Sequence, residues 1–178
     1  MKNSKIFRGG VVETTNSGEW ELIVDHTVEE NCQSVMFTED INGNIFNLRK
    51  ALVYIEVEPN IDDAIESYAS IGVSFGKIGN TYATSFNIGH APSSTENKII
   101  SYGIYEKIGD VVYNTQAMSS FNRTNVTNLL VNKTGYTELR MDNNKKVSTM
   151  EMLRLSTGTA SFGKGSVIKM YGIREVTS

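Results

Sequence analysis

The chain has 178 residues, of which 39% are hydrophobic and 21% charged, and its formal net charge is −3. This is the size and composition of one ordinary globular domain. The small negative charge argues against a nucleic-acid binder, which gathers basic residues on one face. No apolar run reaches the roughly 20 residues that cross a membrane. We therefore expect neither nucleic acid nor a membrane among the partners.

Cysteine usage and the first residues bear on where the protein is made. Cys32 is the only cysteine, which excludes an internal disulfide, and we expect it to be a small half-buried residue. The opening stretch MKNSKIFRGGVVE lacks the continuous apolar segment of a signal peptide. The sequence thus predicts synthesis in a cytoplasm, without export by a recognisable signal.

A hydrophobic period of two begins near Trp20. Residues 1–18 are irregular and are interpreted as an arm that leads into a single domain over residues 19–178. Trp20, Leu22 and Val24 alternate with Glu21, Ile23 and Asp25, which predicts a strand. Residues 35–37 predict a second, short strand.

Asn42-Gly43 is a strong hairpin signal, because both residue types tolerate a positive φ. The segment 46–57 that follows predicts two strands or one bent strand, which Pro59 ends. Residues 61–69 are the one place where apolar residues recur at helical spacing, so we expect at most one short helix there.

The remaining sequence returns to alternation, interrupted by turn-forming clusters such as Asn132-Lys-Thr-Gly. Many short strands with two prolines and hardly any helix predict an all-β fold, a jelly-roll-like antiparallel β-sandwich. The strands predicted after the helix span residues 68–75, 81–89, 98–107, 110–118, 127–132, 134–142, 149–156 and 166–174.

The end of the chain contains a motif that imitates a phosphate-binding loop. Gly158 to Lys164 has the required glycine and lysine spacing, but Gly165 stands where Ser or Thr would hold magnesium, and a strand follows instead of a helix. We interpret the segment as a turn. Residues 40–44, Asp-Ile-Asn-Gly-Asn, faintly resemble a calcium loop but lack its later glycine and glutamate, so a hairpin turn is preferred there too.

The sequence predicts no metal site, no cofactor and no catalytic residues. His26 and His90 are the only histidines, too few and too far apart for an imidazole-based metal centre. A glycoside hydrolase built from two turn carboxylates stays open as an alternative, because such acids can come from distant strands. The acidic pairs available for it are Glu29-Glu30, Glu39-Asp40 and Asp62-Asp63.

Several tyrosines lie among Asn, Ser and Thr, a mixture that suits sugar recognition: an aromatic face covers the pyranose while amides and hydroxyls bond its edges. Half-buried tyrosine is also common in any sheet protein, which is the plainer interpretation for each one. The tyrosines in such surroundings are Tyr82, Tyr102, Tyr105, Tyr113 and Tyr136. As a saccharide site we select Tyr82, His90, Tyr113, Asn122, Arg123 and Tyr136.

Two stretches together resemble a known group of proteins. The first is GEWELIVDHTVEENCQSVMFTEDINGNIFNLRKALVYIEV, and the second is the close, FGKGSVIKMYGIR. The combination is similar to β-sandwich proteins encoded among the tail and baseplate genes of bacteriophages and prophages of Gram-positive bacteria. The matching stretches cover roughly a third of the chain and consist of strand and turn motifs.

The resemblance implies a non-enzymatic structural protein of a virion tail, assembled in the bacterial cytoplasm. It implies tail-tip assembly or binding to a host cell-surface saccharide, with other tail proteins and cell-wall polysaccharide as partners, in a homo-oligomer for which a trimer is favoured. A ligand-free structural adaptor is the further alternative. In such a sandwich the last strand lies inside a sheet, with Ile168 and Met170 on one face and Val167, Tyr171 and Ile173 on the other.

Overall fold

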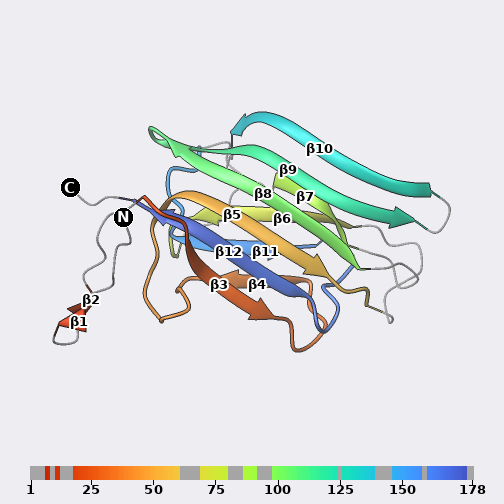
Figure 1. Ribbon diagram of the computed structural model, residues 1–178, viewed down its shortest axis with the longest axis horizontal. Helices are drawn as coiled ribbons and strands as arrows, with labels where there is room; N and C mark the ends of the chain where they lie inside the picture. The colour runs from red at the N-terminus through yellow and green to blue at the C-terminus, as the bar shows by residue number, and fades with distance from the viewer. Residues whose placement is uncertain are drawn as a thin grey trace.

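A computed structural model describes residues 18–60, 71–79, 98–119, 146–157 and 160–175 with their side chains, and the backbone of residues 7–8, 11–12, 69–70, 86–91, 120–123 and 126–138. Every regular element in these ranges is a β-strand. Two antiparallel sheets pack face to face, so the all-β sandwich that the alternation predicts is confirmed (Figure 1).

The larger sheet has six strands in the order β10-β9-β8-β5-β12-β3, and the smaller has four in the order β4-β11-β6-β7. A separate pair, β1 and β2, falls within the residues predicted to form an arm. The bounds are β1 Phe7–Arg8, β2 Val11–Val12, β3 Glu21–Thr27, β4 Ser34–Phe37, β5 Leu48–Val57, β6 Ala69–Gly76, β7 Phe86–Ala91, β8 Ile99–Ile108, β9 Val111–Arg123, β10 Val126–Glu138, β11 Met152–Ser156 and β12 Val167–Arg174.

The chain winds back and forth between the two layers. The steps β3 to β4, β4 to β5 and β5 to β6 each pass from one sheet to the other, and so do β7 to β8, β10 to β11 and β11 to β12. This winding, with antiparallel pairing throughout both sheets, is jelly-roll-like.

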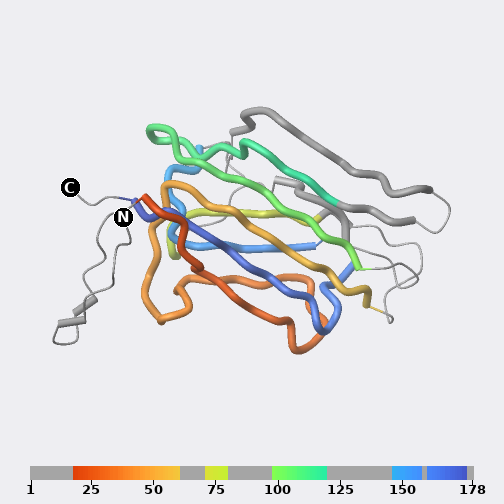
Figure 2. The backbone as a smooth tube through the Cα atoms, viewed as in Figure 1, coloured from red at the N-terminus to blue at the C-terminus, as the bar shows by residue number. Residues whose placement is uncertain are grey.

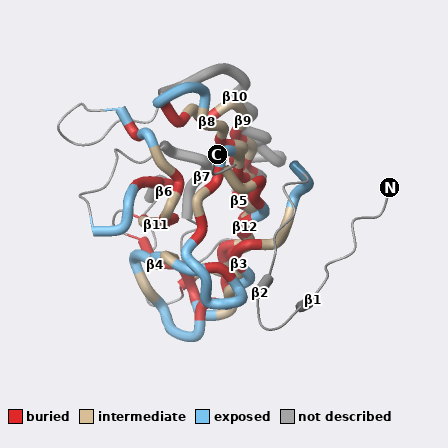
Figure 3. Tube along the Cα trace, turned by 90° about the vertical axis from the view of Figure 1, so that its left-hand side faces the viewer, coloured by how far each residue is buried: buried red, intermediate tan, exposed pale blue. Residues whose placement is uncertain are grey.

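The core lies between the sheets and follows the period of two. In β5 the alternate residues Ala51, Val53 and Ile55 are fully buried, whereas Leu52 and Tyr54 between them are half-buried and face outward. Figure 3 views the sandwich from one end, with buried residues running along both layers. Burying each large aliphatic side chain stabilises the fold by roughly 1.5–3 kcal/mol. The largest fully buried side chains are Tyr105, Phe46, Phe75, Phe162, Ile23, Leu48, Ile55, Ile71, Ile99, Met150 and Met152.

The last strand occupies an internal position. β12 pairs with β5 on one side and with β3 on the other (Figure 2), which confirms the prediction that it lies inside a sheet. Ile168 and Met170 are fully buried. A side chain at Gly172 would be crowded: a Cβ there would lie 2.7 Å from Leu48 Cδ1 and 3.0 Å from Ile23 Cγ1, so these buried side chains would have to shift.

The turn that precedes β12 is hydrogen-bonded to two other parts of the chain. The Gly163 amide donates to the Glu58 carbonyl (3.0 Å), and the Ser166 hydroxyl donates to the Gly163 carbonyl (2.7 Å) while accepting from the Glu58 amide (3.0 Å). Gly165, at φ 92°, donates to the Val28 carbonyl (2.8 Å). The segment that imitates a phosphate loop therefore ties the entry of β12 to the end of β5 and the loop after β3.

The structure differs from two local predictions of secondary structure. The helix predicted at 61–69 is wrong at its last residue, because Ala69 begins β6, and residues 61–68 lie outside the described part. The turn predicted at residues 132–135 is also wrong. β10 runs through it as one strand, and an irregularity in the pairing between Thr134 and Thr137 absorbs the glycine.

The segment 46–57 contains one strand, β5, with an irregularity in its pairing opposite the step from Ile173 to Arg174. This irregularity explains why the apolar parity changes within the segment: Leu48 faces inward before it, and Leu52 faces outward after it.

Candidate functional site

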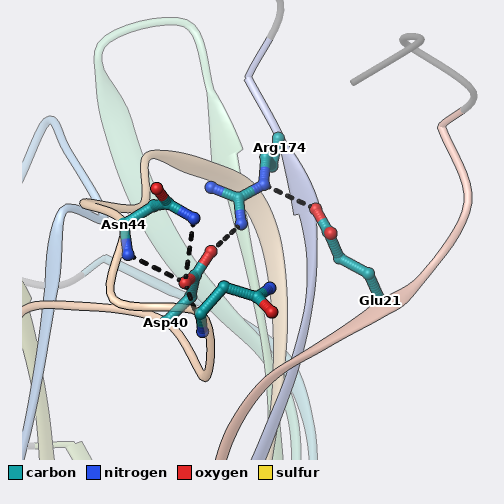
Figure 4. A network of polar contacts seen from close by, with 5 residues as sticks. Glu21, Asp40, Asn44 and Arg174 are labelled. Carbon is teal, nitrogen blue, oxygen red and sulfur yellow. Dashed lines mark hydrogen bonds and ion pairs between the residues drawn. The ribbon is translucent and has the colours of Figure 1, made fainter. Parts of the chain in front are cut away.

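The Asp-Ile-Asn-Gly-Asn segment forms a turn held by its own aspartate (Figure 4). The Asp40 side chain is 1% exposed and accepts hydrogen bonds from the Asn42 amide (2.8 Å) and the Asn44 amide (3.0 Å). Arg174 donates to Asp40 Oδ2 (2.5 Å) and to Glu21 Oε1 (2.7 Å). These bonds occupy the carboxylate. The predicted hairpin turn is confirmed by the bridge between Glu39 and Ile45, and the bond to Arg174 also ties the turn to β12, which the sequence did not predict.

The environment of Asp40 favours its charged form. Burial acts to raise the pKa of this carboxyl, but the amides of Asn44 and Asn42, together with Arg174, outweigh burial and hold the pKa below its ordinary value of 3.8. A carboxylate whose pKa is depressed on folding stabilises the protein above its unfolded pKa, and this contribution disappears as the pH falls through the folded pKa.

We expect Asp40→Asn to lower the free energy of unfolding by about 2 kcal/mol near neutral pH, since hydrogen bonds to a charged group contribute roughly 1.5–3 kcal/mol. Urea titrations from pH 3 to pH 7 measure the difference between variant and wild type. The difference should be constant above about pH 5 and shrink below about pH 4. A pH-independent difference would contradict this account. Glu21→Gln serves as the control and should cost under about 1 kcal/mol, because its ion pair with Arg174 is partly exposed.

The outward side of the six-stranded sheet, called here the outer face, carries a second and larger set of side chains. In Figure 1 this sheet runs across the front of the view, and no described strand lies over it. The pairing register aligns outward side chains of neighbouring strands into rows across the sheet. One row, the tyrosine row, contains Asp25, Lys169, Tyr54, Tyr102 and Met118.

A second row runs beside the tyrosine row and is mostly apolar. It contains Leu22, Tyr171, Leu52, Ile104 and Gln116. Tyr171 is 37% exposed, and the other four are half-buried, so their positions are partly fixed by their neighbours. The two rows together make a surface that is mostly aromatic and aliphatic, with polar side chains at Asp25, Lys169 and Gln116.

The hydroxyls of Tyr54 and Tyr102 have different hydrogen-bond roles: one donates and the other accepts. Tyr54 donates its proton to Glu56 Oε1 (2.8 Å). Burial, then the hydrogen bond and charge of Glu56, raise the pKa of Tyr54 to about 12, so the ring is neutral at physiological pH. Tyr102 instead accepts a bond from Gln116 Nε2 (3.4 Å), which leaves its own proton available to a ligand.

The six residues selected from the sequence fall in different places. Tyr113 is half-buried in β9, opposite Glu106 of β8. Asn122 and Arg123 lie at the far end of the same strand, about 30 Å away at 3.3 Å per residue. His90 belongs to β7 in the smaller sheet.

Tyr136 belongs to β10, close in register to Tyr113, and Tyr82 lies outside the described residues, as do the side chains of His90, Asn122, Arg123 and Tyr136. The fold therefore does not gather Tyr113, Asn122 and His90 into one site.

Neither Tyr54 nor Tyr102 is among the saccharide-site residues predicted from the sequence. The signal was present, since Tyr54 has the parity opposite to the buried Val53 and Ile55 and must point outward. Tyr105, by contrast, is fully buried and packs its ring edge-to-face on Phe75 at 4.9 Å between centroids, so it belongs to the core.

The other residues considered from the sequence are described as follows. Cys32 is half-buried, as predicted, and burial raises the pKa of its thiol. Glu29 and Glu30 are exposed. Asp62 and Asp63 lie outside the described residues. Within the ranges given above, no group of three His, Cys, Asp or Glu side chains could hold a metal ion.

Among the described residues there is also no helix long and apolar enough to cross a membrane.

Comparisons of the chain with protein-family models, with curated proteins and with solved structures gave no match.

Proposed function

We propose that this protein is a non-enzymatic, phage-type tail structural protein whose outer face binds a saccharide of the host cell surface. The observation that carries the proposal is the pairing of Tyr54 with Tyr102 in adjacent strands, at the middle of a sheet face that no described strand covers. Sugar sites combine aromatic rings with a few fixed polar groups. The likeness of two sequence stretches to tail and baseplate proteins supports the tail assignment.

Two properties suit the tyrosines to binding a saccharide: the distance between them, and the fixed orientation of their side chains before a ligand binds. Paired residues on neighbouring strands have Cβ atoms about 5 Å apart, close to the width of a pyranose ring. Both side chains are half-buried, and each hydroxyl has a hydrogen-bond partner that orients it: Glu56 for Tyr54, and Gln116 for Tyr102. Little side-chain entropy is therefore lost when a ligand binds.

A flat face with few polar groups binds one sugar chain weakly, so several copies acting together would hold a cell more firmly. We therefore propose a homo-oligomer, with a trimer favoured, that presents its outer faces side by side on a tail and contacts other tail proteins. Light scattering at micromolar protein concentration tests the oligomer, and a strict monomer would contradict it.

Binding of labelled protein to purified Gram-positive cell walls, before and after removal of their surface polysaccharide, tests the saccharide. We expect saturable binding that disappears with the polysaccharide. Tyr102→Ala and Tyr54→Ala should each weaken binding at least tenfold, and Tyr102→Phe by less, because the ring remains. Met36→Ala, at an exposed residue of the smaller sheet, is the control and should bind as wild type does.

The same preparations separate the alternatives. Release of reducing sugar from the walls would favour the hydrolase and contradict a purely binding protein. Tight, tyrosine-independent binding would move the site away from the outer face. Absence of binding across walls of different composition would favour the ligand-free adaptor.

A further inference from the structure

The charges of the outer face indicate which class of saccharide fits it. We infer that the ligand is an uncharged glycan, held by tyrosine rings and by hydroxyl hydrogen bonds, and not an anionic polymer. The inference rests on the proposed function and adds the chemical class of its ligand.

Among the residues whose side chains the structure describes, the lysines beside the tyrosine row have acidic partners. Lys169 Nζ lies 3.4 Å from Asp25 Oδ2, within the row itself. Lys98 Nζ contacts Glu56 Oε2 at 3.0 Å and Glu58 Oε1 at 2.7 Å, on the side of the row where Glu56 accepts the hydrogen bond from Tyr54. These lysines are engaged by carboxylates of the chain itself.

The opposite side of the face repeats the pattern. Lys50 and Glu106 are paired in register between β5 and β8, and Lys50 Nζ lies 3.4 Å from Glu106 Oε2. Lys50, Lys98 and Lys169 thus face four carboxylates, which leaves the set with one net negative charge. Arg49, which is exposed next to Lys50, is not counted in this set; its Nη2 lies 3.3 Å from where a Cβ on Gly18, three residues before β3, would lie.

An anionic polymer would have to break these pairs and would meet a net negative charge, and like charges brought together disfavour binding. An uncharged glycan disturbs none of them. The polar groups nearest the rings also suit hydroxyls, which donate and accept at once. Tyr102 has a proton to donate, Tyr54 has oxygen lone pairs that can accept, and the Gln116 carbonyl can accept as well.

The test compares one polysaccharide backbone in two charge states. A panel of uncharged polysaccharides (dextran, mannan, galactan and a mixed-linkage glucan) is screened by affinity electrophoresis. Each is then carboxymethylated, and both forms are titrated by calorimetry at 50 mM and 500 mM salt. We expect the uncharged form to bind with little salt dependence, and its carboxymethylated form to bind at least tenfold more weakly.

Charge variants provide the matched control. The double variant Glu58→Gln/Glu106→Gln removes one acidic partner of Lys98 and the partner of Lys50, at residues that belong to neither row. It should gain several-fold in affinity for the carboxymethylated form at 50 mM salt, lose that gain at 500 mM salt, and keep its affinity for the uncharged form.

The outcomes are distinguishable. Equal or tighter binding of the carboxymethylated form by wild type would overturn the uncharged-glycan inference and leave the saccharide-binding proposal standing. Absence of binding to either form of every polysaccharide would overturn both.

Discussion

Removing residues 167–178 is expected to leave a chain that does not fold. The deletion removes β12 from between β5 and β3, so two hydrogen-bonded ladders are lost: β5 becomes an edge strand, and β3 loses the one strand with which it pairs among the described residues. It also removes the fully buried Ile168 and Met170, each contributing roughly 1.5–3 kcal/mol. Together these losses match or exceed the 5–15 kcal/mol that stabilises a typical domain.

Circular dichroism and thermal melting measure the result. The deletion should show no cooperative transition and should aggregate or behave as an expanded chain in gel filtration. A control keeps the strand and changes only its outward side chains, Lys169→Thr and Tyr171→Thr, and should melt cooperatively. A soluble deletion that melts cooperatively would refute the structural role assigned to β12.

Gly163→Ala is expected to destabilise the fold by about 3 kcal/mol or more, at the upper end of what overpacking costs. The added Cβ would lie 2.5 Å from the Glu58 carbonyl oxygen and 2.5 Å from that of Pro59. Both obstacles are backbone atoms, so no side-chain rotation relieves the clash. The strand entry would have to move away and would weaken the 3.0 Å bond from the Gly163 amide to Glu58.

Gly76→Ala is the matched control. Gly76 is also buried, at the end of β6, but a Cβ there would meet no heavy atom within 4 Å. Its stability should change by less than about 0.5 kcal/mol, or rise slightly, because alanine restricts the unfolded chain more than glycine does. Chemical denaturation of both variants decides the matter. Similar free energies of unfolding for the two variants would show that the close approach of the Glu58 and Pro59 carbonyls to Gly163 does not limit stability.

Periodicity predicted the fold well because the core of a sandwich depends on the side-chain alternation it detects. In β5 the buried Val53 and Ile55 and the outward Tyr54 follow directly from the letters. The failed turn at residues 132–135 shows the limit of the method. A Gly-containing polar cluster is equally compatible with a turn and with an irregular strand, and only pairing with β9 decides between them.

The candidate site could be predicted less well, because it depends on register between strands that are distant in sequence. Tyr54 and Tyr102 are 48 positions apart in the numbering and become neighbours only when β5 pairs with β8. The choice of Tyr113 together with Asn122 rests on their residue types, which carry no information on distance, and the extended strand β9 holds them about 30 Å apart. The ion pair between Arg174 and Asp40 likewise joins residues that no local pattern connects.

The central position of β12 also has a consequence for biosynthesis. β12, which completes the six-stranded sheet, is synthesised after every other strand of that sheet, although its two partners, β3 and β5, are made early. Until residue 174 has emerged, those partners have no strand between them, and their exposed edges can pair with other nascent chains. The six-stranded sheet can therefore form only after β12 has been synthesised, and yield in the cell should depend on chaperones that shield β3 and β5 during that interval.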